Sequence, residues 1–231
     1  MLLTVKEIAK MIDLSCVRTI SSKMDIEAMA AAAQKYNFGQ VSVMQCYIPY
    51  TKQLLLNDRQ IHIVGNVSFP SGSDSTTVKV FQAKEMLAAG CDEIDVVMNI
   101  GMLKAGDLAE VESDLRAVID TIRPLPVKVI IEIMYLSPNE VKQACEICLR
   151  TGAAFVKTGT GWADRGTTVE DVRLVKSYVG ESTQIKASGG IRNLDLLVKM
   201  YQAGARRFGV NLISGIKIVE ECLALGSGIE I

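Results

Sequence analysis

Short apolar segments alternate with longer amphipathic segments along the whole chain of 231 residues, and this alternation most constrains the fold. The short segments are rich in β-branched residues and bounded by turn residues, which predicts strands, while the longer ones carry a helical period. Strands that alternate with helices favour a parallel sheet covered by helices. Eight strand–helix units without a linker between them predict an α/β fold, a (β/α)8 TIM barrel, as a single domain of residues 1–231.

A capping-box pattern at Thr4 and Glu7 predicts a short N-terminal helix that ends near Met11. The expected strands are 12–15, 40–43, 61–67, 93–97, 127–132, 154–157, 183–186 and 206–210. The expected helices that follow them are 25–36, 49–56, 78–89, 108–122, 138–150, 168–178, 193–203 and 213–225. A doubly wound open sheet is the alternative, but neither Gly39 nor Gly65 begins the Gly-rich motif that such a sheet carries after an early strand.

Charge and hydropathy exclude several classes of function. The chain has 25 Lys and Arg against 26 Asp and Glu, with the two signs interspersed, so no nucleic-acid partner is expected. Charges interrupt every apolar run before the ~20 residues that a membrane span needs, so no membrane partner is expected either. A charge as early as Lys6 argues against a signal peptide, and a cytoplasmic protein is expected.

The cysteines and the single histidine argue against a metal site. Cys145 and Cys148 lie inside a predicted helix with no second pair to complete a zinc site, so reduced, buried thiols are expected. His62 stands in an apolar strand pattern and is expected to face the helix layer. A metal-dependent aldolase or hydrolase usually needs several histidines, so we expect neither a metal nor another cofactor.

The segment 153–161 places Lys157 at the end of a short apolar strand, directly before a Thr/Gly loop. Burying an ammonium is unfavourable, whereas a desolvated lysine loses its proton easily and becomes a nucleophile. The alternative is a lysine whose ammonium reaches solvent from the strand end. This segment alone does not separate the two interpretations.

The rest of the chain favours a chemical role, because other charges converge on the same end of the predicted barrel. Asp95 and Lys186 also stand at or near the C-terminal ends of their strands, where barrel enzymes carry their sites. Lys128 and Glu132 share one face of the fifth strand by two-residue alternation and are expected to point inward. A structural ion-pair network is the alternative to a site.

These residue types predict carbon–carbon bond cleavage through a covalent amine adduct. Burial and the ammonium of Lys186 would lower the pKa of Lys157 from its usual ~10.4. The neutral amine would attack a carbonyl and lose water to give a protonated Schiff base, which is an electron sink. The neighbouring carbon–carbon bond would then break to an enamine, with Asp95 moving the proton through a water.

A phosphate site is expected beside these groups. Gly189 and Gly190 follow the seventh strand and expose backbone N–H groups just before a helix, and Gly209 follows in the eighth strand. A Gly-Gly pair is more often only a turn, but its position after the strand of Lys186 favours an anion cradle.

Five segments together resemble the deoxyribose-phosphate aldolase family over nearly the whole chain. They are Asp92–Val97, Val127–Glu132, Phe155–Gly161, Thr168–Arg173 and Lys186–Arg192. The resemblance implies a metal-independent class I aldolase barrel that reversibly splits 2-deoxy-D-ribose 5-phosphate into D-glyceraldehyde 3-phosphate and acetaldehyde. It also implies that Lys157 forms the Schiff base, that Lys186 lowers its pKa and that Asp95 relays the proton. The residues expected to bind substrate are Asp13, Ser15, Lys128, Thr158, Thr160, Gly189, Gly190, Gly209 and Asn211.

The sequence departs from that family in two loops. Gly159 replaces the serine of the usual Thr-Ser-Thr-Gly, and Gly209-Val210-Asn211-Leu212 replaces the Gly-x-Ser-Ser that grips phosphate. The second change removes two hydroxyl donors, so an aldolase that acts on a different sugar or sugar phosphate is a further hypothesis. A sugar-phosphate-binding barrel without turnover is a third. The resemblance also suggests a homodimer or homotetramer.

Overall fold

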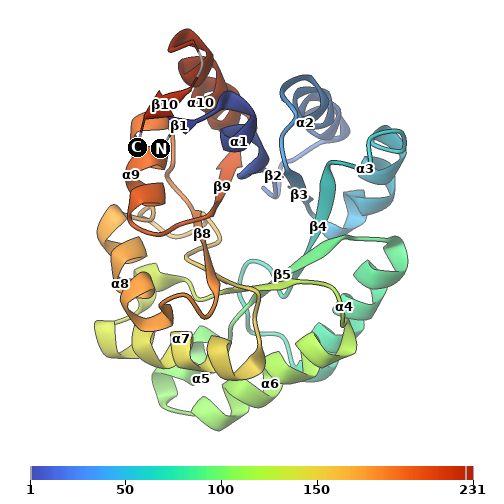
Figure 1. Ribbon diagram of the computed structural model, residues 1–231. Helices are drawn as coiled ribbons and strands as arrows, with labels where there is room; N and C mark the ends of the chain where they lie inside the picture. The colour runs from blue at the N-terminus through green and yellow to red at the C-terminus, as the bar shows by residue number, and fades with distance from the viewer. Residues whose placement is uncertain (1, 227, 231) are drawn as a thin grey trace.

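The computed structural model describes residues 2–226 and 228–230 and shows eight parallel strands closed into a barrel inside a ring of helices (Figure 1). Each strand pairs with its neighbours in chain order, and β9 closes the barrel against β2, with Ser15 opposite Asn211. The barrel strands are β2 (Ile12–Cys16), β3 (Gln40–Val43), β4 (His62–Val67), β5 (Glu93–Val97), β6 (Val127–Ile130), β7 (Phe155–Lys157), β8 (Gln184–Ser188) and β9 (Arg207–Asn211). The predicted (β/α)8 barrel is confirmed. Residues 1, 227 and 231 of the predicted domain lie outside the described part.

Helices connect the strands and begin at the caps that the sequence offers. Thr4, Ser22, Ser137 and Thr168 each form a capping box with the acidic residue three positions later. The helices are α1 (Val5–Lys10), α2 (Lys23–Tyr36), α3 (Ile48–Leu54), α4 (Thr76–Ala89), α5 (Ile100–Ala105), α6 (Leu108–Thr121), α7 (Pro138–Thr151), α8 (Val169–Val179), α9 (Leu194–Gln202) and α10 (Leu212–Ala224). Short 3₁₀ turns cover Gln45–Tyr47 and Ile133–Tyr135.

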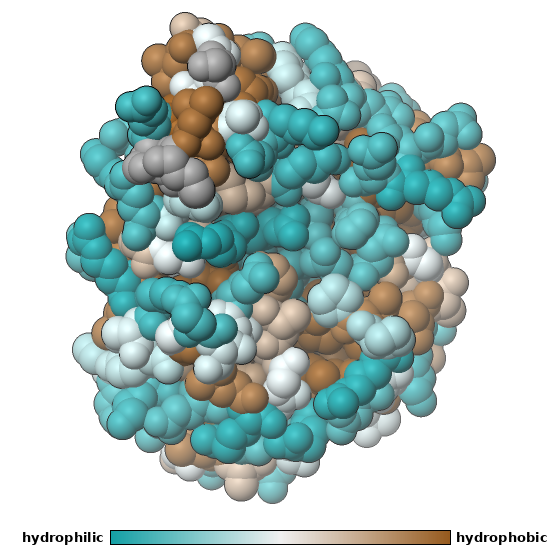
Figure 2. All heavy atoms as spheres, viewed as in Figure 1, coloured by the Kyte–Doolittle hydropathy of each residue, from teal (hydrophilic) through white to brown (hydrophobic). Residues whose placement is uncertain are grey.

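Apolar side chains fill the shell between the strands and the helices. In α6, Val111, Leu115 and Val118 recur at helical spacing and are fully buried against this shell. Figure 2 shows mostly hydrophilic side chains over the face seen in Figure 1, with apolar atoms gathered over α10. Among the described residues, no helix combines the length and apolarity that crossing a bilayer requires.

Three features of the backbone differ from the sequence expectation. The chain ends form an antiparallel pair, β1 (Leu2–Leu3) with β10 (Ile229–Glu230), which lies beside α9 and α10 (Figure 1). Helix α5 was not predicted, and the side chain of Asn99 caps it. The fifth barrel strand ends at Ile130 rather than at Glu132, because Glu132 adopts a left-handed conformation with φ of 43°. Strand alternation therefore does not set the direction of the Glu132 side chain.

Candidate active site

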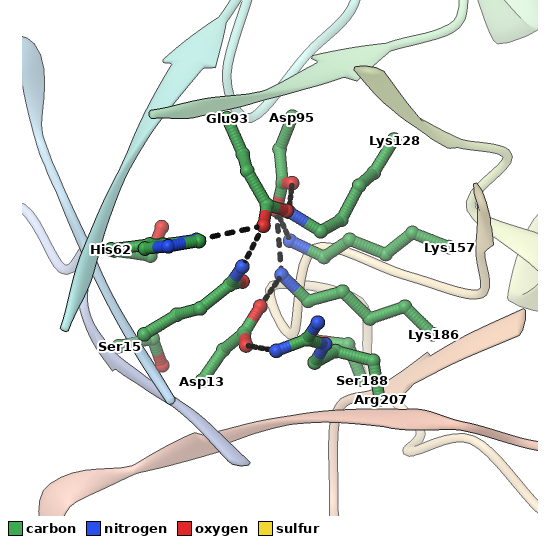
Figure 3. A network of polar contacts seen from close by, with 12 residues as sticks. Asp13, Ser15, His62, Glu93, Asp95, Lys128, Lys157, Lys186, Ser188 and Arg207 are labelled. Carbon is green, nitrogen blue, oxygen red and sulfur yellow. Dashed lines mark hydrogen bonds and ion pairs between the residues drawn. The ribbon is translucent and has the colours of Figure 1, made fainter. Parts of the chain in front are cut away.

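Strands β5, β7 and β8 bring the three predicted catalytic side chains together inside the barrel (Figure 3). A single carboxylate oxygen, Oδ2 of Asp95, lies 2.7 Å from Nζ of Lys157 and 2.9 Å from Nζ of Lys186. All three side chains are buried, and Lys157 is 5 % exposed. The amine therefore does not reach bulk solvent, which contradicts the surface-lysine alternative.

Burial and charge give the two amines opposite protonation behaviour. Burial lowers the pKa of Lys157 to about 8, with the ammonium of Lys186 adding to the shift and the carboxylate of Asp95 opposing it. Burial also acts on Lys186, but the carboxylates of Asp13 and Asp95 outweigh it and raise the pKa of that amine. Lys157 is thus the amine that loses its proton near neutral pH, while Lys186 stays charged.

Asp95 stays ionised in the middle of this cluster. Burial by itself would raise its pKa, but the ammonium groups of Lys157, Lys186 and Lys128 hold the pKa well below the usual range. Asp13 supports the same arrangement from β2, with its Oδ2 atom 2.5 Å from Nζ of Lys186. Two carboxylates therefore fix the position of Lys186.

The positive and negative charges of the ion-paired side chains inside the barrel are equal in number when the amine of Lys157 is neutral. Three carboxylates and four basic side chains interact through ion pairs there: Asp13, Glu93, Asp95, Lys128, Lys157, Lys186 and Arg207. A neutral Lys157 leaves three positive charges against three negative ones, and buried charges are tolerated only when they are paired. The cluster as a whole therefore favours the unprotonated form of Lys157.

His62 lies inside the barrel, so the prediction that it faces the helix layer is wrong. Asn66 of the same strand donates to Oγ of Ser42, and strand alternation gives His62 the same inward direction. Its Nδ1 atom lies 3.3 Å from Oε1 of Glu93 at the N-terminal end of the barrel (Figure 3). The local sequence misled because parallel strands carry apolar residues on both faces, which hides the alternation.

A cavity of about 430 Å³ lies at the C-terminal ends of β2, β8 and β9, and Asp95, Lys157 and Lys186 are not among the residues that line it. Ser15, Ser188 and Gly209 are among its lining residues, together with the predicted Gly189, Gly190 and Asn211. Ser15 donates from Oγ to the carbonyl of Val210. The cavity is thus bordered by β2, β8 and β9, and β8 pairs with β7, the strand that carries Lys157.

Gly189 and Gly190 form a backbone feature that other residues would disfavour. Their φ angles are 99° and 81°, and a Cβ atom on Gly190 would lie 2.9 Å from the Cα atom of Gly166. Neither N–H group donates to a backbone or side-chain acceptor in the described ranges. The pair therefore presents free donors to the cavity, as an anion cradle requires.

Asn211 has a structural task in addition to its place on the cavity wall. Its side-chain oxygen caps α10 by accepting from the backbone N–H of Ser214 at 2.8 Å. The capping bond uses this acceptor oxygen and leaves the amide N–H₂, the donor group of the side chain, able to donate to a ligand.

Thr158 and Lys128, both predicted to bind substrate, do not line this cavity. Thr158 is fully buried, and its Oγ1 atom accepts from the backbone N–H of Ser188. Lys128 is also fully buried and pairs with Glu93, while its Nζ atom lies 3.5 Å from Oδ1 of Asp95. The structure therefore gives both residues contacts beneath the cavity.

Glu132 orients the loop that follows Lys157. Both of its carboxylate oxygens accept from the backbone N–H of Thr160 at 3.2 Å, and burial raises the pKa of the carboxyl group. Thr160 in turn accepts from the N–H of Trp162. Glu132 is thus buried, as expected, but it holds the loop rather than completing a strand face.

Trp162 divides the mouth of the barrel, which sequence reasoning did not foresee. Its ring packs edge-on against Phe69 and lies under the guanidinium of Arg18, 5.2 Å from the centroid. Arg18 also donates to the carbonyl of Gly161 at 2.9 Å. A second cavity of about 200 Å³ on the other side shares Thr160 and Trp162 with the larger one. The contacts join three distant loops, so no local pattern could reveal them.

The cysteines remain thiols and the described residues hold no metal cluster. Cys145 and Cys148 are buried in α7, as predicted, and burial raises the pKa of Cys145 to about 12. Cys46, in contrast, is exposed. Within residues 2–226 and 228–230, no three His, Cys, Asp or Glu side chains gather as a metal site would require.

A closed (β/α)8 barrel that buries a lysine of lowered pKa beside an ammonium and a carboxylate is suited to a carbon–carbon lyase of the aldolase type. Comparison with known proteins gives the family. The DeoC/LacD family aldolase model matches residues 9–219, so the chain belongs to this family and is an aldolase.

Curated relatives and solved structures agree with this assignment. Deoxyribose-phosphate aldolase of Carboxydothermus hydrogenoformans is 42 % identical over 218 residues, covering 93 % of this chain and 94 % of the relative. The enzyme of the same name from Rhizobium meliloti is 37 % identical over 223 residues, covering 96 % and 90 %. The solved structure of QR15, an aldolase, matches with a TM-score of 0.88 at 35 % identity, covering 94 % of this chain and 96 % of that one.

Proposed function

We propose that this aldolase reversibly splits 2-deoxy-D-ribose 5-phosphate into D-glyceraldehyde 3-phosphate and acetaldehyde through a Schiff base on Lys157. Its curated relatives carry the name deoxyribose-phosphate aldolase. The observation that carries the mechanism is the buried amine of Lys157, whose pKa is lowered to about 8, 2.7 Å from the carboxylate of Asp95.

The first half of the reaction makes the covalent adduct. The neutral amine of Lys157 attacks the aldehyde carbon of the open-chain sugar and forms a carbinolamine. This intermediate loses its hydroxyl group as water and becomes a protonated iminium on the Lys157 nitrogen. Lys186 remains an ammonium beside it and disfavours protonation of the free amine, which promotes the attack.

The second half breaks the carbon–carbon bond. Asp95, acting through a water, accepts the proton of the hydroxyl group on C3, and the C2–C3 electron pair moves into the iminium to give an enamine. D-Glyceraldehyde 3-phosphate leaves, and the proton returns to C2. Water then hydrolyses the iminium, which releases acetaldehyde and regenerates Lys157, so no net proton is consumed.

The larger cavity suits the phosphorylated end of the sugar. Gly189 and Gly190 offer free N–H donors on its wall, and Arg18 and Arg192 also line it. Ser15, Gly209 and the amide of Asn211 would contact the sugar along the same path. Thr160 also lines the cavity, while Asp13, Lys128 and Thr158 support this site from the surrounding structure.

Borohydride trapping tests the proposal directly. Reduction in the presence of acetaldehyde or deoxyribose 5-phosphate is expected to attach the substrate carbons to Lys157, as located by peptide mass spectrometry. Lys157→Leu is expected to abolish the adduct, whereas Lys217→Leu, which removes an exposed lysine of α10, is expected to retain it. An enzyme that turns over the sugar without an adduct at Lys157 would contradict the mechanism.

A second candidate substrate is a sugar without phosphate. It is favoured by Val210-Asn211-Leu212, where no hydroxyl donor is present. Rates with deoxyribose 5-phosphate and with deoxyribose separate the two. A higher kcat/KM for the phosphorylated sugar supports the leading proposal, and a higher value for deoxyribose supports the second.

Three further properties follow from the sequence, the last of them through its family resemblance. We propose that residues 1–231 act as one domain, that the protein is cytoplasmic and that it forms a homodimer or homotetramer. Val78 and Phe81 lie one turn apart on α4 with exposed side chains, and such apolar surface is typical of subunit contacts. Light scattering coupled to gel filtration would give the mass, and a monomer at micromolar concentration would contradict the last point.

A further inference from the structure

The lower half of the barrel holds a continuous series of polar contacts that the proposed chemistry does not use. It starts at His62, whose side chain is 49 % exposed at the N-terminal end, and passes through Glu93 and Lys128 to Asp95 (Figure 3). Nδ1 of His62 lies 3.3 Å from Glu93, Glu93 pairs with Lys128, and Lys128 lies 3.5 Å from Asp95. The series thus links solvent at one end of the barrel with the proposed catalytic carboxylate.

Packing does not explain these groups. Lys128 is fully buried and Glu93 is nearly so, and a buried ion pair contributes little stability compared with apolar side chains of similar size. Gln40 also donates to Glu93, so three groups converge on that one carboxylate. The arrangement therefore calls for a role in the chemistry above it.

The two oxygens of Asp95 have different surroundings. Oδ2 contacts Lys157 and Lys186, whereas Oδ1 faces Lys128 at 3.5 Å and accepts no hydrogen bond from the described residues. Glu93 contacts the ammonium of Lys128 more closely than Asp95 does. Glu93 therefore keeps the ammonium of Lys128 from moving closer to Oδ1 of Asp95.

We propose that His62, Glu93 and Lys128 are positioning residues that keep Asp95 available to Lys157, and that a positive charge on His62 weakens this arrangement. A charged imidazole competes with Lys128 for Glu93, so the ammonium of Lys128 turns toward Oδ1 of Asp95. Asp95 then faces three ammonium groups and becomes a weaker base. This inference deepens the proposed function and rests on it.

The groups that face His62 define the sign of the effect. They are Glu93 on β5, Asp92 just before β5, Arg207 on β9 and the neutral Gln40 on β3. The hydrogen bond to Glu93 is the main reason that the pKa of His62 is raised. Protonation of His62 therefore sets in at a higher pH than for a free imidazole, and it should lower kcat because Asp95 acts after the substrate has bound. It should also lower the pKa of free Lys157, since it adds positive charge to the cluster.

Two substitutions at His62 test the inference in the full-length enzyme. In His62→Lys the positive charge is fixed, and kcat at pH 8.5 is expected to fall about 3- to 10-fold, with the acid limb of kcat/KM shifting down by about half a pH unit. In His62→Gln a neutral amide still donates to Glu93, so kcat at pH 8.5 is expected to match the wild-type value. The part of its decline at lower pH that comes from protonation of His62 is expected to disappear. If His62 had a purely structural role, neither the pH dependence of kcat nor the acid limb of kcat/KM would change.

Glu93→Gln provides an independent variant, because it removes the counter-charge of Lys128 itself. As in His62→Lys, kcat at pH 8.5 is expected to fall and the acid limb of kcat/KM to shift down, but both changes should be larger. Thermal unfolding of the same preparation confirms that the variant folds. If it does not fold, the two His62 variants at a half-exposed position still decide the question. Lys217→Gln on the surface serves as the matched control.

The failure of this inference is distinguishable from failure of the proposed function. If the wild-type enzyme forms no borohydride adduct at Lys157, the proposed mechanism falls, and this inference falls with it. If the adduct forms but the pH profiles of both His62 variants coincide with the wild-type profile, only the positioning role is overturned.

Discussion

The inside of the barrel and the shell between barrel and helices contain opposite kinds of side chain. The shell is filled by Val, Ile, Leu and Ala from both layers, most of them with no exposed surface. The barrel interior instead holds three carboxylates and four basic groups connected by ion pairs. Most side chains of both regions are buried, but only the shell gains free energy from burial.

This difference indicates how the molecule divides its tasks. Apolar burial in the shell stabilises the barrel, which can then hold charges in positions that would be unfavourable by themselves. Lys79 is the exception in the shell, since it is fully buried on α4 and its Nζ atom lies 2.5 Å from Asp114 of α6. Comparing Lys79 with Lys157 therefore separates a buried charge that stabilises the fold from one that serves the chemistry.

Replacing Lys157 in the barrel interior should give the largest effect of all, and this effect should fall on activity and not on stability. Lys157→Leu is expected to lower kcat/KM about 10⁴-fold or more, as removal of a covalent nucleophile does in other enzymes. Its free energy of unfolding should stay the same or rise, because the other six charges balance without it. Steady-state kinetics and urea unfolding of the same preparation give both quantities, and a large loss of stability would contradict the charge balance.

Breaking the Lys79–Asp114 ion pair in the shell should instead reduce stability and leave activity nearly unchanged. Lys79→Met leaves Asp114 buried without its partner, which is expected to reduce the free energy of unfolding by about 3–5 kcal/mol. Pairing it with Asp114→Leu should restore most of this loss. Urea unfolding measures both, while kcat/KM of the folded fraction is expected to stay within about twofold, since this pair joins α4 to α6 outside the barrel. A double variant as unstable as the single one would contradict this interpretation.

An apolar truncation in the shell should affect stability in the same way but somewhat less. Leu115 is fully buried on α6, and Leu115→Ala is expected to lower the free energy of unfolding by about 3 kcal/mol through lost burial and the cavity left behind. Thermal or urea unfolding tests the value. Activity below the melting temperature should be unchanged, and a specific loss of kcat would show that shell and interior are coupled.

The pH dependence of kcat/KM should show how the barrel interior changes the titration of Lys157. Because the pKa of Lys157 is lowered to about 8, the neutral amine becomes scarcer as pH falls below that value. We expect kcat/KM to drop about 50-fold between pH 8 and pH 6 and to level off above pH 8.5. A profile that keeps rising to pH 10 would mean that Lys157 titrates like an exposed lysine.

The sequence was informative where one short segment carried the signal. Asp95, Lys157 and Lys186 could be placed because each stands at or near the end of a clear strand, and strand ends meet at one mouth in a barrel. Glu93 and Arg207 stand two residues before Asp95 and Gly209, so the same alternation would have predicted them inside. His62 was assigned to the wrong face because its neighbours are apolar on both sides.

The features missed altogether depend on contacts between distant segments. The packing of Trp162 against Phe69 and Arg18 joins three loops, and the β1–β10 pair joins the two ends of the chain. The left-handed Glu132 likewise depends on the loop of Thr160 that it binds. Local propensity carries no information about such partners.

The sequence by itself determined the order of strands and helices, their caps and the end of each strand at which a charge stands, because these follow from local periodicity and side-chain chemistry. Only the tertiary structure decided which charges share a carboxylate, which amine is buried beside which ammonium and what lies beneath them. Protonation depends on distances of a few ångströms between residues far apart in the chain, and those distances exist only after the barrel has closed.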